Sequence, residues 1–278
     1  MVNSSSPPEP SGLDLSLINH ASSWDRVASD YAGFIAEHAG RYAADALRLA
    51  KISEHDEVLD VATGPGTLAL QAARITRVHA LDFSAQMLEA LRQQADEQQL
   101  ANLSLQQGDG QALPYADASF DLGFSMFGLF LFPDRGRGFA ELARVLRPGA
   151  RAVVASWQPQ DRIVAFTIVN SELGKEIASP SSGGLALADP DVFEAEMREA
   201  GFEVEIHPVV HVLETPSLDA LWEGIKRSHV ALAIAADQLE PGRFDDLCAR
   251  IRVRLERELG SGRQEVEMPA WLALGRRR

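Results

Sequence analysis

Three short acidic turns hold the residues whose types and spacing are best suited to chemistry. The first, DVATGPG, spans residues 60–66, the second ends in Asp82, and the third is Gly108-Asp109-Gly110. Glycines in the first turn let the backbone approach a ligand closely, and free amides at the start of the following helix favour a negatively charged group. The Asp82 carboxylate can accept hydrogen bonds from both hydroxyls of a ribose. Brought together, the three turns would form a nucleoside pocket.

Alternating strands and helices are predicted to bring these turns together. Strand-like runs cover residues 57–61, 78–81, 103–106, 120–124 and 150–155, with helical patterns or turns between them. Five strands that alternate with helices indicate a parallel, doubly wound α/β sheet. In such a sheet ligands bind beyond the carboxyl ends of the strands, where the strand order reverses. The first three strands each end in, or run into, one of the acidic turns.

The rest of the chain predicts more strands and a helical cap. Residues 202–213 and 266–274 form an antiparallel pair at the sheet edge, with helical patterns over 218–236 and 244–259 between them. Helical spacing also runs from Trp24 to Leu49, before the first strand. We therefore predict a doubly wound, seven-stranded, mostly parallel sheet with an antiparallel edge strand and a helical cap.

Charge and composition narrow the function classes. The 278 residues include 26 Lys and Arg against 40 Asp and Glu, a net charge of −14, so no nucleic acid or anionic lipid partner is expected. A single cysteine, Cys248, fits a reducing compartment. The longest apolar stretch has about half of the roughly 20 residues of a membrane span, and the Ser- and Pro-rich start lacks secretory-signal features. These observations predict a cytoplasmic protein.

Two cofactor classes fit the predicted pocket. The pattern Gly64-x-Gly66-x-x-Ala69, with Asp82 further on, satisfies the dinucleotide-binding fingerprint and indicates an NAD-dependent oxidoreductase. Asp60 argues against that class, because its carboxylate would lie near the pyrophosphate and repel it. A cationic amine is the better neighbour for Asp60.

Four motifs resemble those of the class I S-adenosylmethionine-dependent methyltransferases. They are VLDVATGPGTLAL, LDFSAQML, GDGQALPYADASFDLGFSMFGLFLFPD and ELARVLRPGA, and they occur in this order. The resemblance covers about residues 24–157 and is closest to the branch with ubiquinone- and menaquinone-biosynthesis enzymes and many small-molecule methyltransferases. It implies a Rossmann-like methyltransferase fold with S-adenosylmethionine as the cofactor.

The resemblance also implies which residues hold the cofactor. The methionine part would lie against Asp60, Thr63, Gly64 and Gly66. Asp82 would hold the ribose hydroxyls, and the adenine would meet Phe83, Met87, Asp109 and Gly110.

On the acceptor side, the resemblance places Ser125 and Phe127 at the border of the methyl-transfer site. Tyr31 and Trp24, from the amino-terminal helix, would close over the cofactor. Phe127, Phe130 and Phe132 could line an apolar pocket, and core packing explains such residues equally well. Trp157, at the end of a strand, is a further pocket candidate.

Methyl transfer from a sulfonium is an in-line displacement, so alignment matters more than a catalytic triad. An acceptor that is protonated at neutral pH also requires a base, and His229 is the candidate because its helical segment is expected to cover the acceptor site. A surface helix histidine is the alternative. His207 and His211 share a strand face and are interpreted as half-exposed residues, so no metal site is predicted, and Cys248 is interpreted as a core residue.

We hypothesise methyl transfer from S-adenosylmethionine to a small, partly apolar metabolite, at an oxygen, nitrogen or carbon atom. An NAD-dependent oxidoreductase and a non-catalytic S-adenosylmethionine-binding protein stay open as alternatives, as does a homo-oligomer. The expected organisation is a disordered leader over residues 1–22 and one methyltransferase domain over 23–278. Within that domain, residues 23–50 form a helical cap, 51–157 the cofactor-binding core, and 158–278 the acceptor-side helices and last two strands.

Overall fold

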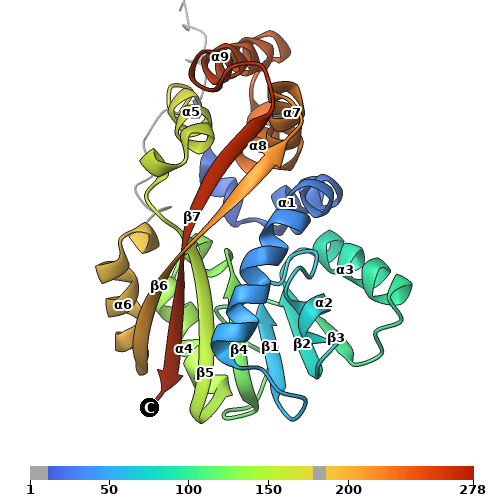
Figure 1. The fold of residues 1–278 in the computed structure, drawn as a ribbon, viewed down its shortest axis with the longest axis vertical. Coiled ribbons are helices and arrows are strands. Elements are labelled where there is room, and N and C mark those ends of the chain that lie inside the picture. Colours follow the sequence, from blue (N-terminus) through green and yellow to red (C-terminus); the bar gives the residue numbers. More distant parts are fainter. Residues whose placement is uncertain (1–11, 178–185) are drawn as a thin grey trace, which may run out of the picture.

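A seven-stranded sheet forms the centre of the computed structural model, which describes residues 12–177 and 186–278 (Figure 1). The strands are β1 (Glu57–Val61), β2 (Arg77–Asp82), β3 (Leu103–Gln107), β4 (Phe120–Met126), β5 (Leu146–Trp157), β6 (Phe202–Thr215) and β7 (Gln264–Arg277). Their order is β3-β2-β1-β4-β5-β7-β6; β7 runs antiparallel to both of its neighbours, β5 and β6, and the other adjacent pairs are parallel. The predicted mostly parallel sheet is confirmed, with β7 reversed one place inside the outermost strand, β6.

Helices cover both faces of the sheet because strand residues alternate in direction. Val58 and Leu122 pack on the face covered by α1 (Ala21–Ala50), α2 (Ala69–Ala72) and α3 (Ala85–Glu97). Leu59 and Val61 pack on the opposite face, against α4 (Arg135–Val145) and α6 (Pro190–Glu199). The strand order reverses between β1 and β4, so the crevice beyond their carboxyl ends is where a ligand is expected.

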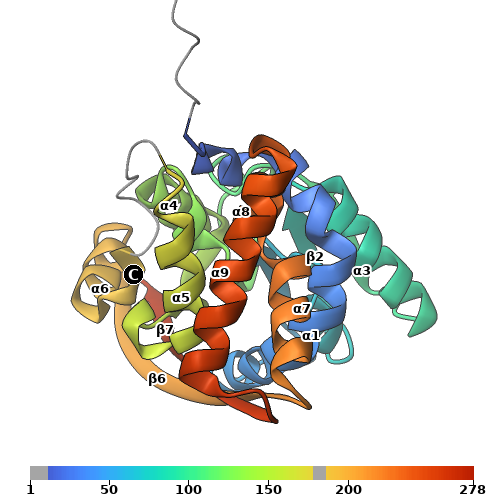
Figure 2. The same ribbon diagram turned by 90° about the horizontal axis from the view of Figure 1, so that it is seen from above.

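Four helices form a cap beyond the carboxyl ends of the parallel strands. They are α5 (Val164–Leu173), α7 (Leu218–Ser228), α8 (Val230–Gln238) and α9 (Pro241–Leu259). Figure 1 shows β6 and β7 extending past β5 into this cap, and Figure 2 shows α9 lying between α5 and the α7–α8 pair. The single helical pattern predicted over 218–236 is divided at His229, which ends α7 and begins α8. Among the described residues, no helix has the length and apolar character needed to cross a membrane.

Short 3₁₀-helices lie at the turns, and the first of them corrects the predicted leader. They are η1 (Leu15–Asn19), η2 (Leu129–Leu131), η3 (Gln160–Arg162) and η4 (Ala186–Ala188). The leader predicted over 1–22 lies partly outside the described residues, since these begin at residue 12. Over 12–22 the prediction is wrong: Leu13 is buried, and its N–H donates to the Glu176 carbonyl at 2.8 Å.

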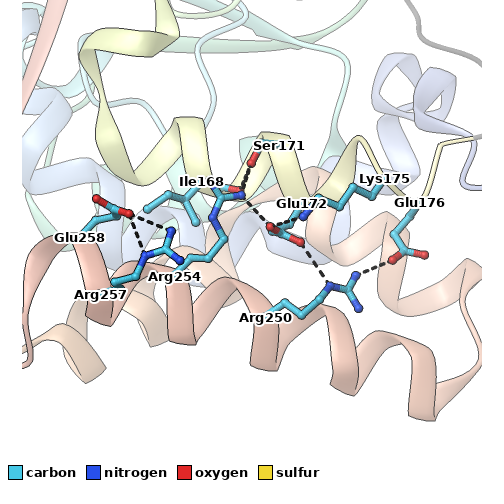
Figure 3. A network of polar contacts seen from close by, with 9 residues as sticks. All are labelled: Ile168, Ser171, Glu172, Lys175, Glu176, Arg250, Arg254, Arg257 and Glu258. Atoms are coloured by element: carbon cyan, nitrogen blue, oxygen red, sulfur yellow. Dashed lines mark hydrogen bonds and ion pairs between the residues drawn. The ribbon is translucent and has the colours of Figure 1, made fainter.

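A buried carboxylate fastens two cap helices to each other (Figure 3). Glu172 of α5 is only 1% exposed and accepts hydrogen bonds from Lys175 at 2.6 Å, from Arg254 at 2.6 Å and from Arg250 at 3.2 Å. Burial alone would raise the pKa of Glu172, but these cationic donors lower it to about 2. Because Arg250 and Arg254 belong to α9, the network joins α5 to α9.

Replacing Glu172 with Gln is expected to lower the free energy of unfolding by about 2–3 kcal/mol at pH 7. The folded-state pKa lies below the unfolded value, so the contribution is full above about pH 4.5 and is lost as the pH falls toward 2. Urea unfolding at several pH values should therefore show the wild type and variant converging in acid. Glu258→Gln is the matched control, because the exposed Glu258–Arg257 pair should contribute less than about 1 kcal/mol. Equal effects of the two substitutions would contradict the assignment.

Candidate cofactor and methyl-transfer site

Asp60, near the end of β1, presents an unpaired carboxylate oxygen. Its side chain is 1% exposed, and Oδ2 accepts a hydrogen bond from the Thr63 hydroxyl at 2.6 Å. Oδ1 is buried and has no hydrogen-bond partner among the described residues. Burial, and secondarily the nearby Asp82, raises the pKa of Asp60 to about 7. A buried oxygen without a donor is a binding position for a cationic or hydrogen-bonding ligand group.

Both glycine amides of the turn after β1 already have hydrogen-bond acceptors within the protein. The Gly64 N–H donates to Asp82 Oδ2 at 2.8 Å, and the Gly66 N–H donates to the Thr63 carbonyl at 3.0 Å. These two amides are therefore not free for an anionic group, which corrects that expectation. Gly64 has φ +55°, and a Cβ placed there would meet no heavy atom within 4 Å, so bare backbone faces open space.

Asp82, at the end of β2, is held by two backbone donors. Gly64 donates to Oδ2, and Ser84 N–H donates to Oδ1 at 2.9 Å. Each carboxylate oxygen has a second acceptor position, which leaves two positions for two ligand hydroxyls. Asp82 is 5% exposed, and burial raises its pKa to about 6, although backbone N–H groups of Ser84, Gly64 and Phe83 act to lower it; the charge of Asp25 adds to the increase.

Asp60 and Asp82 border a cavity of about 290 Å³ beyond the carboxyl ends of β1, β2 and β4. Eleven of the predicted site residues line it and are thus brought together: Trp24, Tyr31, Asp60, Thr63, Gly64, Asp82, Phe83, Met87, Asp109, Gly110 and Phe127. The third acidic turn is shaped by Gly110, since a Cβ there would lie 2.4 Å from Phe132 Cζ.

Four predicted residues do not line the cavity. Gly66 lies behind the turn, where a Cβ would come within 2.1 Å of Leu91 Cδ1, so its role is to let α3 approach. Ser125 is fully buried and accepts a hydrogen bond from the Leu129 N–H at 3.2 Å. Trp157 stacks behind Phe127, with ring centroids 4.0 Å apart.

His229, the predicted base, is the fourth residue outside the cavity. It is buried at the junction of α7 and α8, where burial lowers its pKa to about 4. Its ring contacts Phe166, which contacts Trp157, which in turn backs Phe127. The histidine is therefore separated from the cavity by aromatic rings, and the cavity geometry does not support it as a base.

The two histidines of β6 and the single cysteine, Cys248, lie in surroundings where the described residues form no reactive or metal-binding site. On β6, His211 pairs with Asp45 at 2.7 Å, and His207 is 37% exposed beside Glu205. Among the described residues, no group of three or more His, Cys, Asp or Glu side chains could hold a metal ion. Cys248 is buried in α9 within the core, as its helical position indicates.

Several cavity residues were not identified from the sequence. Ile18 and Asn19 belong to η1, inside the segment expected to be a leader. Ala39 and Ala43 lie on the same face of α1 as Tyr31, eight and twelve residues further on, and this helical spacing was the signal that could have revealed them. The others are Thr67, Leu68, Leu81, Gln111, Met126, Gly128, Leu131 and Pro133. Phe132, one of the three aromatic residues expected at an apolar pocket, does line the cavity, as do Ala62, Pro65 and Gly108 of the acidic turns.

Two residues that line the cavity have strained backbones. Ala62 follows β1 with φ +55°, and Phe127 follows β4 with φ +58°. Residues other than glycine rarely adopt this left-handed conformation, which costs about 1–3 kcal/mol and is concentrated at functional sites. Both lie where the strand order reverses, so the strain is located at the site itself.

Comparisons with known proteins agree with this geometry. A family model described as a methyltransferase domain matches residues 58–149. The chain is 34% identical to the demethylmenaquinone methyltransferase of Deinococcus radiodurans over 61% of this chain and 75% of that enzyme. It is also 34% identical to the ubiquinone/menaquinone biosynthesis C-methyltransferase UbiE of Geobacter sulfurreducens, over 44% of this chain and only 50% of that protein. A proposed methyltransferase from Bacillus halodurans shares the fold, with a TM-score of 0.58 and 20% identity over 84% of this chain and 97% of its own.

The chain belongs to the S-adenosylmethionine-dependent methyltransferases, and S-adenosylmethionine is its cofactor. The comparisons do not support the two alternatives, an NAD-dependent oxidoreductase and a non-catalytic binding protein.

The described residues fit this cofactor. The orphaned Asp60 oxygen suits the ammonium group of the methionine part, and the spare acceptor positions of Asp82 suit the ribose hydroxyls. The bare backbone at Gly64 leaves room between them. These individual assignments are predictions, which the following substitutions test.

Asp60→Asn should weaken S-adenosylmethionine binding at pH 8 and stabilise the cofactor-free protein. A raised folded-state pKa means that ionising Asp60 destabilises the fold, fully above about pH 7 and not at all below the unfolded value of 3.8. The gain in melting temperature should therefore be largest at pH 8 and shrink toward pH 5. Wild-type affinity should rise with pH between about 6 and 7.5, since a cation prefers the ionised carboxylate. Thermal unfolding and isothermal titration across this range provide the measurements, and a variant no more stable than the wild type at pH 8 would contradict the assignment.

Asp82→Ala should weaken S-adenosylmethionine binding by about 1–3 kcal/mol through the loss of charged hydrogen bonds. Isothermal titration with the folded variant tests this, and Asp96→Ala, at an exposed position near the end of α3, is the control. Unchanged affinity in a folded Asp82→Ala protein would show that the ribose assignment is wrong.

Proposed function

We propose that the protein methylates a small, flat and largely apolar acceptor, such as a quinone-like ring. The observation that carries this proposal is the two-sided lining of the cavity. Carboxylates gather at the ends of β1 and β2, whereas Met126, Phe127, Leu131 and Phe132 contribute apolar surface at and after the end of β4. Ala39 and Ala43 of α1 add small apolar surface.

The charge of the lining supports a neutral acceptor. None of the described residues that line the cavity is Lys, Arg or His. An acceptor with a carboxylate or phosphate would therefore find no cation to pair with it in the cavity, and the acidic side chains would repel it. Nucleic acid is disfavoured for the same reason.

The relatives point in the same direction. The Deinococcus and Geobacter proteins carry names of quinone-biosynthesis methyltransferases, and the identity to each is 34%. When bound, the cofactor supplies a methyl group on a good leaving group, so this chain must align the acceptor and exclude water. Tyr31, whose pKa burial raises to about 12, keeps its proton at neutral pH and is suited to donating a hydrogen bond to an acceptor oxygen.

The proposal extends to organisation and location. Residues 51–157 would bind the cofactor, residues 23–50 would cover it, and residues 158–278 would shape the acceptor side of one domain. The lone cysteine supports a reducing, cytoplasmic location.

An acceptor screen with methyl-labelled S-adenosylmethionine and mass analysis of the products tests the proposal. We expect a demethylated naphthoquinol to be methylated at least tenfold faster than amino-acid or phosphorylated amine acceptors. Faster methylation of a charged acceptor would overturn the proposal.

Leu131→Asp should lower kcat/KM for the apolar acceptor at least tenfold and leave the Kd for S-adenosylmethionine within about threefold, because Leu131 lies at the apolar end of the cavity. Val253→Asp introduces the same charge at a 63% exposed position on α9 and is the control. An equal loss of kcat/KM in both variants would show that the apolar end of the cavity is not the acceptor site.

A further inference from the structure

Asp25 of α1 caps the start of a different helix, α3. Its Oδ1 accepts a hydrogen bond from the Ser84 hydroxyl at 2.6 Å and another from the Gln86 N–H at 3.1 Å. Ser84 is the N-cap residue of α3, and its own hydroxyl accepts from the Met87 N–H at 3.1 Å. The first amides of a helix lack partners within the helix and favour negative charge. One carboxylate from α1 therefore completes the end of α3.

The same contact connects α1 to the carboxylate assigned to the ribose. The Ser84 hydroxyl donates to Asp25, and the Ser84 backbone N–H donates to Asp82 Oδ1 at 2.9 Å. Asp82 in turn accepts from the Gly64 N–H of the glycine turn. A continuous chain of hydrogen bonds therefore runs from Asp25 through Ser84 and Asp82 to Gly64, and every link is buried or partly buried.

Asp25 also lies in the segment that walls the cavity. Trp24 precedes it, Tyr31 follows at less than two turns, and the two rings make an edge contact at 6.1 Å. The Trp24 indole N–H donates to the Ile18 carbonyl at 2.8 Å, which ties η1 to the same wall. At its far side, the wall is attached to the cap by Arg26–Asp237 and by the Asp14 N–H on Gln238 at 2.8 Å.

We propose that Asp25 is a positioning residue for S-adenosylmethionine, because it holds the wall of residues 15–31 against the cavity through the hydrogen bonds that also orient Asp82. Movement of this wall away from the cavity would then also loosen Asp82, the carboxylate assigned to the ribose hydroxyls. Ile18, Asn19, Trp24 and Tyr31 of this wall line the cavity of about 290 Å³, so a displacement of the wall changes the cavity itself. The inference rests on the cofactor and does not depend on which acceptor is methylated.

Asp25→Asn tests the proposal without any acceptor. The amide keeps the shape of the side chain, and its Oδ1 can still accept, but the negative charge that strengthens the hydrogen bonds from Ser84 and Gln86 is lost. We expect the dissociation rate of S-adenosylmethionine, and of its demethylated product, to rise about tenfold in stopped-flow displacement. Hydrogen exchange of the amides in residues 15–31 should also lose the protection that the cofactor confers.

Two controls separate positioning from a general effect. Asp30→Asn makes the same charge change at an exposed position of α1 and should leave the dissociation rate within twofold. Ser84→Ala removes the shared hydroxyl from the other side. If the contact acts as proposed, the double variant Asp25→Asn/Ser84→Ala should release the cofactor no faster than the faster single variant, and Ser84→Ala alone suffices if Asp25→Asn does not fold.

Three outcomes would overturn the proposal. Dissociation within twofold of the wild type in a folded Asp25→Asn protein would show that the contact does not retain the cofactor. Equal effects of Asp25→Asn and Asp30→Asn would indicate net charge alone. Tighter binding by Asp25→Asn below pH 6 would show that Asp25 acts only by repelling Asp82. In steady state, the positioning role predicts a higher KM for S-adenosylmethionine with kcat little changed.

Discussion

Two buried carboxylates at the ends of neighbouring parallel strands are the constraint on which this structure depends. Asp60 and Asp82 are almost fully buried, and burial raises the pKa of each. An ionised carboxylate in this position is unfavourable unless hydrogen bonds or a cation compensate. Thr63 provides one compensating donor for Asp60, and the Gly64 and Ser84 amides provide two for Asp82. The remaining deficit, the unpaired Asp60 oxygen, is what a cationic cofactor can satisfy.

The glycine turn follows from this constraint. Its residues adopt left-handed backbone at Ala62, Gly64 and Gly66, and that conformation directs the Gly64 N–H to Asp82. The strain at Ala62 has a counterpart at Phe127 across the β1–β4 crevice. Tight packing maintains both: a Cβ on Gly128 would lie 2.5 Å from the Ala62 Cβ. Strained backbone of this kind persists only where the surroundings determine it, and here the surroundings are two adjacent strands of the central sheet.

The sheet, and most of the residues that line the cavity at its carboxyl edge, could be predicted from the sequence because their signals are local. Short apolar runs identify strands, and a strand that ends in Asp82 places that side chain at the sheet's carboxyl edge wherever the helices lie. The predictions that failed required knowledge of side-chain direction near the end of a strand. Ser125 and Trp157 lie in the last residues of β4 and β5, but the Ser125 hydroxyl accepts from the Leu129 N–H and Trp157 packs behind Phe127.

The prediction of a disordered leader before residue 23 failed for a different reason. Residues 12–22 have no helical apolar pattern of their own, and their order depends on distant partners, Glu176 for Leu13 and Gln238 for Asp14. Contacts between residues more than 160 positions apart leave no periodic signal in a sequence. His229 shows the same limit, because its helical segment was correctly expected in the cap, whereas its burial against Phe166 depends on how α5 packs.

Local and distant contacts also hold different parts of the site. The groups suited to the cofactor are held by the sheet and its adjacent turns, through short-range hydrogen bonds such as Thr63 to Asp60. Much of the remaining enclosure comes from η1 and α1, which reach the site from outside the sheet. Changes in these outer segments can therefore alter the acceptor space while leaving Asp60 and its turn intact. Asp25 is the exception, because its bond to Ser84 connects the outer wall to Asp82 at the end of β2.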